Sequence, residues 1–150
     1  HNAEGKLVAY CGRWPGEPAE DAPKYKLPAG FHKSQEIFNL HRALRQPNEE
    51  PLIIVEGFFD AMKLWQQGAK RVVALMGCTL SDAQEELIRR HTDSRSQILL
   101  MLDEDEAGRT ARDDIAARLS KFAFVKIHVF DQDGRQPEHL SAEEISSLFD

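Results

Sequence analysis

The stretch LLMLDEDEAG at residues 99–108 decides the fold and the site of this chain. Its apolar run ends in two aspartates, Asp103 and Asp105, which are two positions apart. A second apolar run, at residues 52–55, ends in Glu56 and a glycine. Each run predicts a buried strand. Acidic residues at the ends of two strands indicate a site for a divalent cation.

The bulk composition fits one domain with a small appendage. The chain has 150 residues, and the 41% that are hydrophobic are enough for a real core. No apolar run approaches the ~18 residues that cross a membrane. No signal sequence opens the chain, so a cytoplasmic location is expected. Cys11 and Cys78 are isolated, which argues against a zinc site within this chain and against a disulfide framework.

The charge is distributed unevenly. The net charge is -6, but residues 1–45 carry seven basic against five acidic residues, whereas residues 46–150 carry twelve against twenty. A basic front section and an acidic body suit a protein whose acidic groups hold cations and whose basic groups face phosphate. Chance asymmetry on a solvated surface is the alternative.

Strands alternate with helices after a polar, proline-bounded linker at residues 46–51. The boundary predicts a small N-terminal part at 1–48 and a main domain at 49–150. The alternation predicts an α/β fold with a mostly parallel sheet flanked by helices. The expected strands are 6–13, 52–56, 72–75, 97–102 and 124–130; the expected helices are 35–46 after Ser34, 58–67, about 82–91 after Ser81, 107–120, and a short one after Ser141.

The acidic residues lie where such sheets bind ligands, beyond the carboxyl ends of the strands. Mg2+ prefers oxygen ligands and often takes only one or two carboxylates from the protein. In an extended turn, Asp103 and Asp105 point to one side, and Glu104 is expected to point away into solvent. The alternative is that these residues are ordinary helix N-caps and solvated turn residues.

The segments IIVEGFFDAMKL (53–64) and LLMLDEDEAGRTA (99–111) resemble the two signatures of the TOPRIM domain. TOPRIM domains occur in topoisomerases, bacterial DnaG-type primases, some nucleases and recombination proteins. The run from Val72 to Gly77 resembles the middle strand and glycine turn of the family. The resemblance implies a TOPRIM (Rossmann-like) fold with a small N-terminal α+β subdomain.

Residues 5–33 resemble the segment that precedes TOPRIM in bacterial primases, where a strand ends in Gly-Arg and Pro-Lys-Tyr and Phe-x-Lys follow. The resemblance implies that four of these residues bind the template or the phosphates of the incoming nucleotide, together with the turn at Gly77. Without the resemblance, the same residues would be interpreted as parts of a loop on a solvated surface. The four residues are Arg13, Lys24, Tyr25 and Lys33.

The same resemblance implies a metal site for Mg2+ or Mn2+ built from carboxylates. Asp60 lies four residues after Glu56 and reads alternatively as a surface charge. Primases usually carry Asp-Pro-Asp after the last strand, whereas residues 134–138 here read Gly-Arg-Gln-Pro-Glu, with the neutral Gln136 in an acidic position. The implied metal ligands are Glu56, Asp60, Asp103, Asp105 and Glu138, and the implied catalytic residues are Glu56, Asp103 and Asp105.

The function implied by the resemblance is primase-type nucleotidyl transfer, in which RNA primers are made on single-stranded DNA from ribonucleoside triphosphates. A replicative helicase would bind through regions outside this chain, and no membrane partner is expected. A metal-dependent nuclease and a non-catalytic DNA-binding module are the alternatives. Phe58, Phe59 and Met76 occupy apolar positions and are expected to fill the core rather than to bind bases.

Overall fold

The computed structural model describes residues 1–17, 22–130 and 135–148. Pro18 and Gly134, which belong to the predicted loop and to the predicted C-terminal motif, lie outside the described residues. The expected α/β fold is confirmed: a parallel sheet has the strand order β4-β3-β5-β6. Its strands are β3 (Leu52–Val55), β4 (Val72–Ala74), β5 (Gln97–Leu100) and β6 (Phe124–Ile127).

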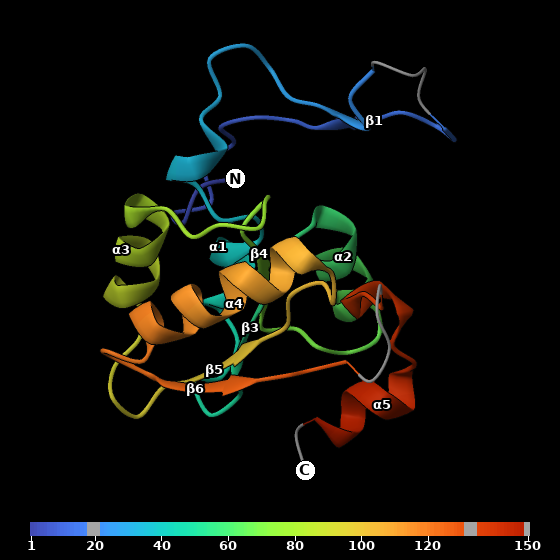
Figure 1. Cartoon of the computed structure of the whole chain (residues 1–150). Helices are drawn as coiled ribbons and strands as arrows, with labels where there is room; N and C mark the ends of the chain where they lie inside the picture. The colour runs from blue at the N-terminus through green and yellow to red at the C-terminus, as the bar shows by residue number, and fades with distance from the viewer. Residues whose placement is uncertain (18–21, 131–134, 149–150) are drawn as a thin grey trace.

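Helices cover both faces of this sheet (Figure 1). Alternate residues of β3 face opposite ways: Leu52 and Ile54 pack with α3 and α4, and Ile53 and Val55 pack with α2 and α5. Two apolar cores result, one on each face, as expected for strands buried on both sides. The helices are α2 (Phe58–Gln66), α3 (Asp82–Arg90), α4 (Glu106–Leu119) and α5 (Ala142–Ser147).

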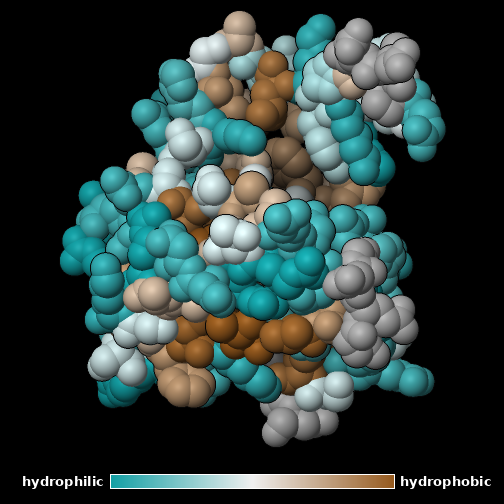
Figure 2. All heavy atoms as spheres, in the orientation of Figure 1, coloured by the Kyte–Doolittle hydropathy of each residue, from teal (hydrophilic) through white to brown (hydrophobic). Residues whose placement is uncertain are grey.

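Strand β6 is an edge strand, and its outer side chains are exposed. Figure 2 shows a hydrophobic band beneath the polar surface of α4, in the region of β6. Phe124 is 65% exposed, and Ile127 and Val129 are also exposed. Within the part of the chain that the structure describes, no helix is long and apolar enough to cross a membrane.

The strand predicted at residues 6–13 is wrong except at its end. Only β1 (Gly12–Arg13) is paired, antiparallel with β2 (Tyr25–Lys26), and this hairpin lies above the body in Figure 1. Leu7 and Tyr10 are exposed. A period-2 apolar pattern is not enough for a strand, because the backbone also needs a neighbour, and residues 6–11 have none among the described strands.

The helix predicted at 35–46 is also wrong in extent. A 3-10 turn (η1, Lys33–Gln35) comes first, and only α1 (Leu40–Ala43) is α-helical. Between them, Phe38 exchanges backbone hydrogen bonds of 3.0 and 3.1 Å with Ala74 of β4, and Asn39 turns the chain with a φ of 67°. Pairing with β4 therefore wins over helix propensity here. The division between 1–48 and 49–150 stays a prediction.

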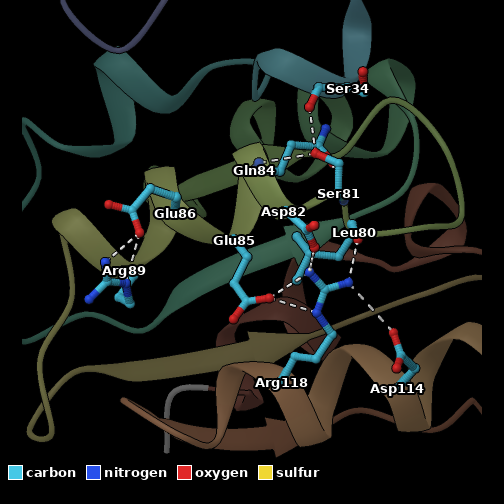
Figure 3. A network of polar contacts seen from close by, with 10 residues as sticks. All are labelled: Ser34, Leu80, Ser81, Asp82, Gln84, Glu85, Glu86, Arg89, Asp114 and Arg118. Atoms are coloured by element: carbon cyan, nitrogen blue, oxygen red, sulfur yellow. Dashed lines mark hydrogen bonds and ion pairs between the residues drawn. The ribbon is translucent and has the colours of Figure 1, made fainter.

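A polar network joins α3 to its surroundings (Figure 3). The side chain of Gln84 is 1% exposed, and its Nε2 donates to the carbonyl of Leu75 at 2.8 Å and to that of Glu36 at 2.9 Å. The predicted capping box of Ser81 and Gln84 is present. Arg118 of α4 binds Glu85 across the helix pair. Gln84 thus fixes the segment that carries Lys33 against the sheet.

Replacing Gln84 with alanine should lower the free energy of unfolding by about 2 kcal/mol, because the buried carbonyl of Leu75 and the partly buried carbonyl of Glu36 lose their donor. Urea denaturation measures this change. The matched control is Gln97→Ala at an exposed position, which should change stability little. Equal effects of the two substitutions would contradict the role given to Gln84.

Candidate active site

A cleft of about 410 Å³ lies at the carboxyl ends of β3 and β5. We call its acidic residues, Glu56, Asp60, Asp103 and Glu138, the acidic wall, and its basic and aromatic residues from the N-terminal hairpin, η1 and the start of α2 the basic wall. All the predicted site residues except Asp105 line this cleft: Glu56, Asp60, Asp103, Glu138, Arg13, Lys24, Tyr25, Lys33 and Gly77. The fold therefore brings together residues that lie as far apart in sequence as Arg13 and Glu138.

Glu56 and Asp103 meet because β3 and β5 pair in parallel, with Ile54 opposite Leu100. The backbone N–H of Asp103 donates to Glu56 Oε1 at 3.1 Å. Asp103 Oδ2 accepts a hydrogen bond of 2.8 Å from Gln136 Nε2. Asp103 Oδ1 is buried and has no hydrogen-bond partner among the described residues. A carboxylate oxygen in this condition is suited to a cation.

Asp60 is a buried residue, so the alternative reading as a surface charge is wrong: its exposed fraction is 6%. Its Oδ2 accepts from the backbone N–H of Gly57 at 3.1 Å, and its Oδ1 accepts from that of Glu138 at 3.2 Å. The carboxylate thus holds the start of α2 against η2 (Pro137–His139). Its role as a metal ligand stays a prediction.

Asp105 is the N-cap of α4 and is exposed. Its Oδ1 accepts a hydrogen bond of 2.8 Å from the backbone N–H of Gly108. This capping role is the one that the alternative interpretation of the Asp-x-Asp pair predicts. The cap uses only Oδ1, so a cation can still bind Oδ2 of Asp105. The charge of Asp105 is close enough to raise the pKa of both Glu56 and Asp103. Its catalytic and metal-binding roles stay predictions.

The expectation that Glu104 faces solvent is wrong, since the residue is only 7% exposed. Its carboxylate lies 3.2 Å from Arg112 and 3.6 Å from Arg109, both on the first turns of α4. Its backbone N–H donates to the carbonyl of Arg135 at 3.2 Å. Burial of a charge is tolerated because it is paired. The strand-turn pattern of the sequence does not reveal the two arginine partners, which come from the following helix.

Gly108 is required by the close approach of α4 to the loop that carries Asp103. A Cβ at this position would lie 2.1 Å from the carbonyl oxygen of Asp103 and 3.0 Å from Glu56 Oε1. Since these neighbours are backbone and a site carboxylate, they have little freedom to move. The glycine lets the N-terminus of α4 lie against the acidic wall.

Burial and mutual repulsion weaken the acidity of the two central carboxyls. Burial is the larger cause that raises the pKa of Glu56 to about 7, and the charge of Asp103 adds to it. Burial also raises the pKa of Asp103 to about 6, with further contributions from Asp60 and Asp105. The hydrogen bond from Gln136 acts in the opposite direction. A bound cation would relieve this repulsion.

The basic wall is held by aromatic contacts. The guanidinium of Arg13 lies 3.9 Å from the ring centroid of Phe59 and 5.9 Å from that of Tyr25. Tyr25 in turn packs against Phe58, with ring centroids 5.6 Å apart. Lys33 Nζ would lie 3.5 Å from a Cβ at Gly77, so the lysine side chain reaches the turn after β4.

Phe58 and Phe59 were expected in the core, but both are partly exposed and line the cleft. Met76 is largely buried and also reaches it. The sequence contains a signal for this position, because both phenylalanines come just after the strand-terminal Glu56 and Gly57 and so start α2 at the ligand-binding edge.

The residues present fit a divalent cation such as Mg2+ or Mn2+. The donors at the acidic wall are oxygens, which hard cations prefer, and Asp103 Oδ1 is unsatisfied. Within residues 1–17, 22–130 and 135–148, no three His, Cys, Asp or Glu side chains form a ready metal cage. Mg2+ sites commonly complete their shell with water and substrate phosphate, so a partial set is sufficient.

These features define a TOPRIM-type acidic site on a parallel sheet. A family model described as Toprim-like matches residues 53–137, and the chain belongs to this family. The resemblance of its sequence to TOPRIM domains is thereby confirmed.

The similar proteins are DNA primases. A DNA primase of Pseudomonas aeruginosa is 38% identical over 116 residues, which is 73% of this chain and 16% of that protein. The crystal structure of the Aquifex aeolicus primase, with zinc-binding and RNA polymerase domains, matches with a TM-score of 0.81 and 29% identity over 99% of this chain and 38% of that chain. A DnaG primase catalytic domain bound to single-stranded DNA matches with a TM-score of 0.76 and 26% identity, over 98% of this chain and 47% of that chain. The chain thus spans about a sixth of the length of the first curated relative.

Gly108→Ala should lower the free energy of unfolding by about 1–3 kcal/mol or more, because the new methyl group overlaps the carbonyl of Asp103. Thermal and urea unfolding measure the loss. Gly12→Ala is the control, since its Cβ would meet only the carbonyl of Lys26 at 3.9 Å. A Gly108→Ala protein as stable as the wild type would contradict the close approach described above.

The metal-free protein should lose stability as the pH rises through about 7. The pKa of Glu56 is raised from 4.5 to about 7, so the folded state holds the proton more tightly, and this stabilisation is complete only below pH 4.5. Melting temperatures in EDTA should therefore fall between these pH values more steeply for the wild type than for Glu56→Gln. Glu143→Gln, at an exposed position, serves as the control. Parallel curves for wild type and Glu56→Gln would refute this assignment.

Proposed function

We propose that this chain forms part of a primase-type nucleotidyltransferase, which extends an RNA primer on a single-stranded DNA template. The observation that carries the proposal is one cleft lined both by Glu56 and Asp103 and by Arg13, Lys24 and Lys33. A cleft lined by both acidic and basic side chains suits a nucleoside triphosphate together with its divalent cation. The similarity to DNA primases supports this choice among TOPRIM functions.

In the proposed reaction, the 3′-hydroxyl of the primer attacks the α-phosphorus of a ribonucleoside triphosphate. A phosphodiester bond forms, the bond between the α-phosphorus and the bridging oxygen breaks, and pyrophosphate leaves; the hydroxyl proton passes to solvent. Mg2+ or Mn2+, when bound, supplies positive charge to the phosphate oxygens and lowers the pKa of the attacking hydroxyl. Glu56 and Asp103 would hold the ion, with Asp105 as a further candidate ligand.

The other residues position the substrates. Lys24 and Lys33 would neutralise phosphate charge, and Arg13 would offer a planar fork to phosphate from its place on the Phe59 ring. Tyr25 presents a ring on which a base can stack. Phosphoryl transfer depends mainly on position and charge, so the site needs no nucleophilic side chain.

Asp103→Asn should reduce template-dependent incorporation of labelled ribonucleotides by about 10²-fold or more, because a ligand of the cation is lost. The assay uses single-stranded DNA and Mg2+ or Mn2+, with the exposed Asp113→Asn as a matched control that should keep its activity. The same variants are compared for metal-dependent nucleotide binding.

The outcome separates the three functions considered for this sequence. Primers that require both template and Asp103 support the proposal. Degradation of the DNA by the wild type but not by Asp103→Asn would replace it with a nuclease. DNA binding that is indifferent to metal and to Asp103, without synthesis or degradation by the wild type, would replace it with a binding module.

A further inference from the structure

The hydrogen bond between Gln136 and Asp103 occupies one side of the acidic wall. Gln136 Nε2 donates to Asp103 Oδ2 at 2.8 Å, a normal length for a hydrogen bond to a carboxylate. An amide N–H group is a donor and cannot serve as a ligand for a cation. As long as this contact is made, a metal ion cannot approach that oxygen from the same side.

Gln136 is held in place by its neighbours. Its backbone N–H donates to His139 Nδ1 at 3.1 Å at the start of η2. Two residues further on, the backbone N–H of Glu138 donates to Asp60 Oδ1, which ties this turn to α2. The side-chain amide of Gln136 therefore reaches Asp103 from a turn that is itself held by hydrogen bonds.

The carboxylate oxygens of Asp60 and Asp103 consequently fall into two groups. On the side of Gln136, backbone or amide N–H groups bind both oxygens of Asp60 and Oδ2 of Asp103. On the other side, Asp103 Oδ1 is buried without a partner among the described residues. Asp103 Oδ1 can therefore bind a cation, whereas the hydrogen bond from Gln136 already satisfies Asp103 Oδ2.

We propose that Gln136 closes Oδ2 of Asp103 to cations, so that the site holds a single divalent ion, bound by Glu56 and Asp103 Oδ1. The inference rests on the proposed function, because it takes the acidic wall to be a metal site. Gln136 acts here as a positioning residue, which limits the number of ions and orients Asp103 toward the one that binds.

Gln136→Asp tests this directly. The shorter side chain removes the donor, opens space next to Asp103 Oδ2 and adds oxygen ligands, which are the conditions that a second hard cation requires. Gln66→Glu makes the same change in charge at an exposed position of α2 outside the cleft. It therefore controls for a general increase in negative charge.

Binding of Mn2+ is counted by electron paramagnetic resonance of the free ion at equilibrium, and folding of each variant is checked by circular dichroism. We expect one Mn2+ per chain for the wild type and for Gln66→Glu, and two for Gln136→Asp. Two ions in the wild type, a second ion in Gln66→Glu, or only one in a folded Gln136→Asp would overturn the inference. The wild-type count decides it even if Gln136→Asp does not fold.

Glu56→Gln separates this inference from the proposed function. We expect this variant to lose the single ion. If Glu56→Gln binds as many ions as the wild type, the metal site itself is wrong. If the wild type binds two ions and Glu56→Gln loses one or both, the metal site stands and only the role of Gln136 is refuted. No binding by any of the proteins would overturn both.

Discussion

The parallel pairing of β3 with β5 determines where the charged groups of the cleft lie. With Ile54 opposite Leu100, the two strands end together, and the next residues along each chain place Glu56 beside the backbone of Asp103. A shift of one residue would turn every side chain of β3 to the opposite face of the sheet. Packing in the two apolar cores therefore fixes the register of β3 against β5. This register in turn fixes the positions of Glu56 and Asp103.

Around this edge, each neighbouring element is joined to the wall by a specific contact. Helix α4 approaches through Gly108, and its arginines pair with Glu104 between the two aspartates. The turn at η2 reaches both Asp60 and Asp103. The N-terminal hairpin contributes Arg13, which rests on Phe59 at the start of α2. Segments distant in sequence are thus fixed around one small volume of about 410 Å³.

The sequence alone predicts most of the sheet and most of the cleft, for identifiable reasons. Apolar runs that end in Glu56 and Asp103 signal buried parallel strands, and the position at their carboxyl ends implies a ligand site. What it does not reveal depends on tertiary partners. The pairing of Phe38 with β4 replaces much of a predicted helix, and the arginines of α4 bury Glu104. Likewise, the sequence shows that Gln136 is neutral, but only the structure shows that its amide binds Asp103.

The central claim is that the unsatisfied oxygen of Asp103 and the carboxylate of Glu56 form the metal site of this TOPRIM domain. A crystal structure of the protein soaked in Mn2+, with anomalous diffraction recorded near the manganese edge, tests it most directly. We expect one anomalous peak within bonding distance, about 2.0–2.3 Å, of Asp103 Oδ1 and of a Glu56 oxygen. A peak bound only by other residues, or an Asp103 that contacts no ion in manganese-loaded crystals, would contradict it.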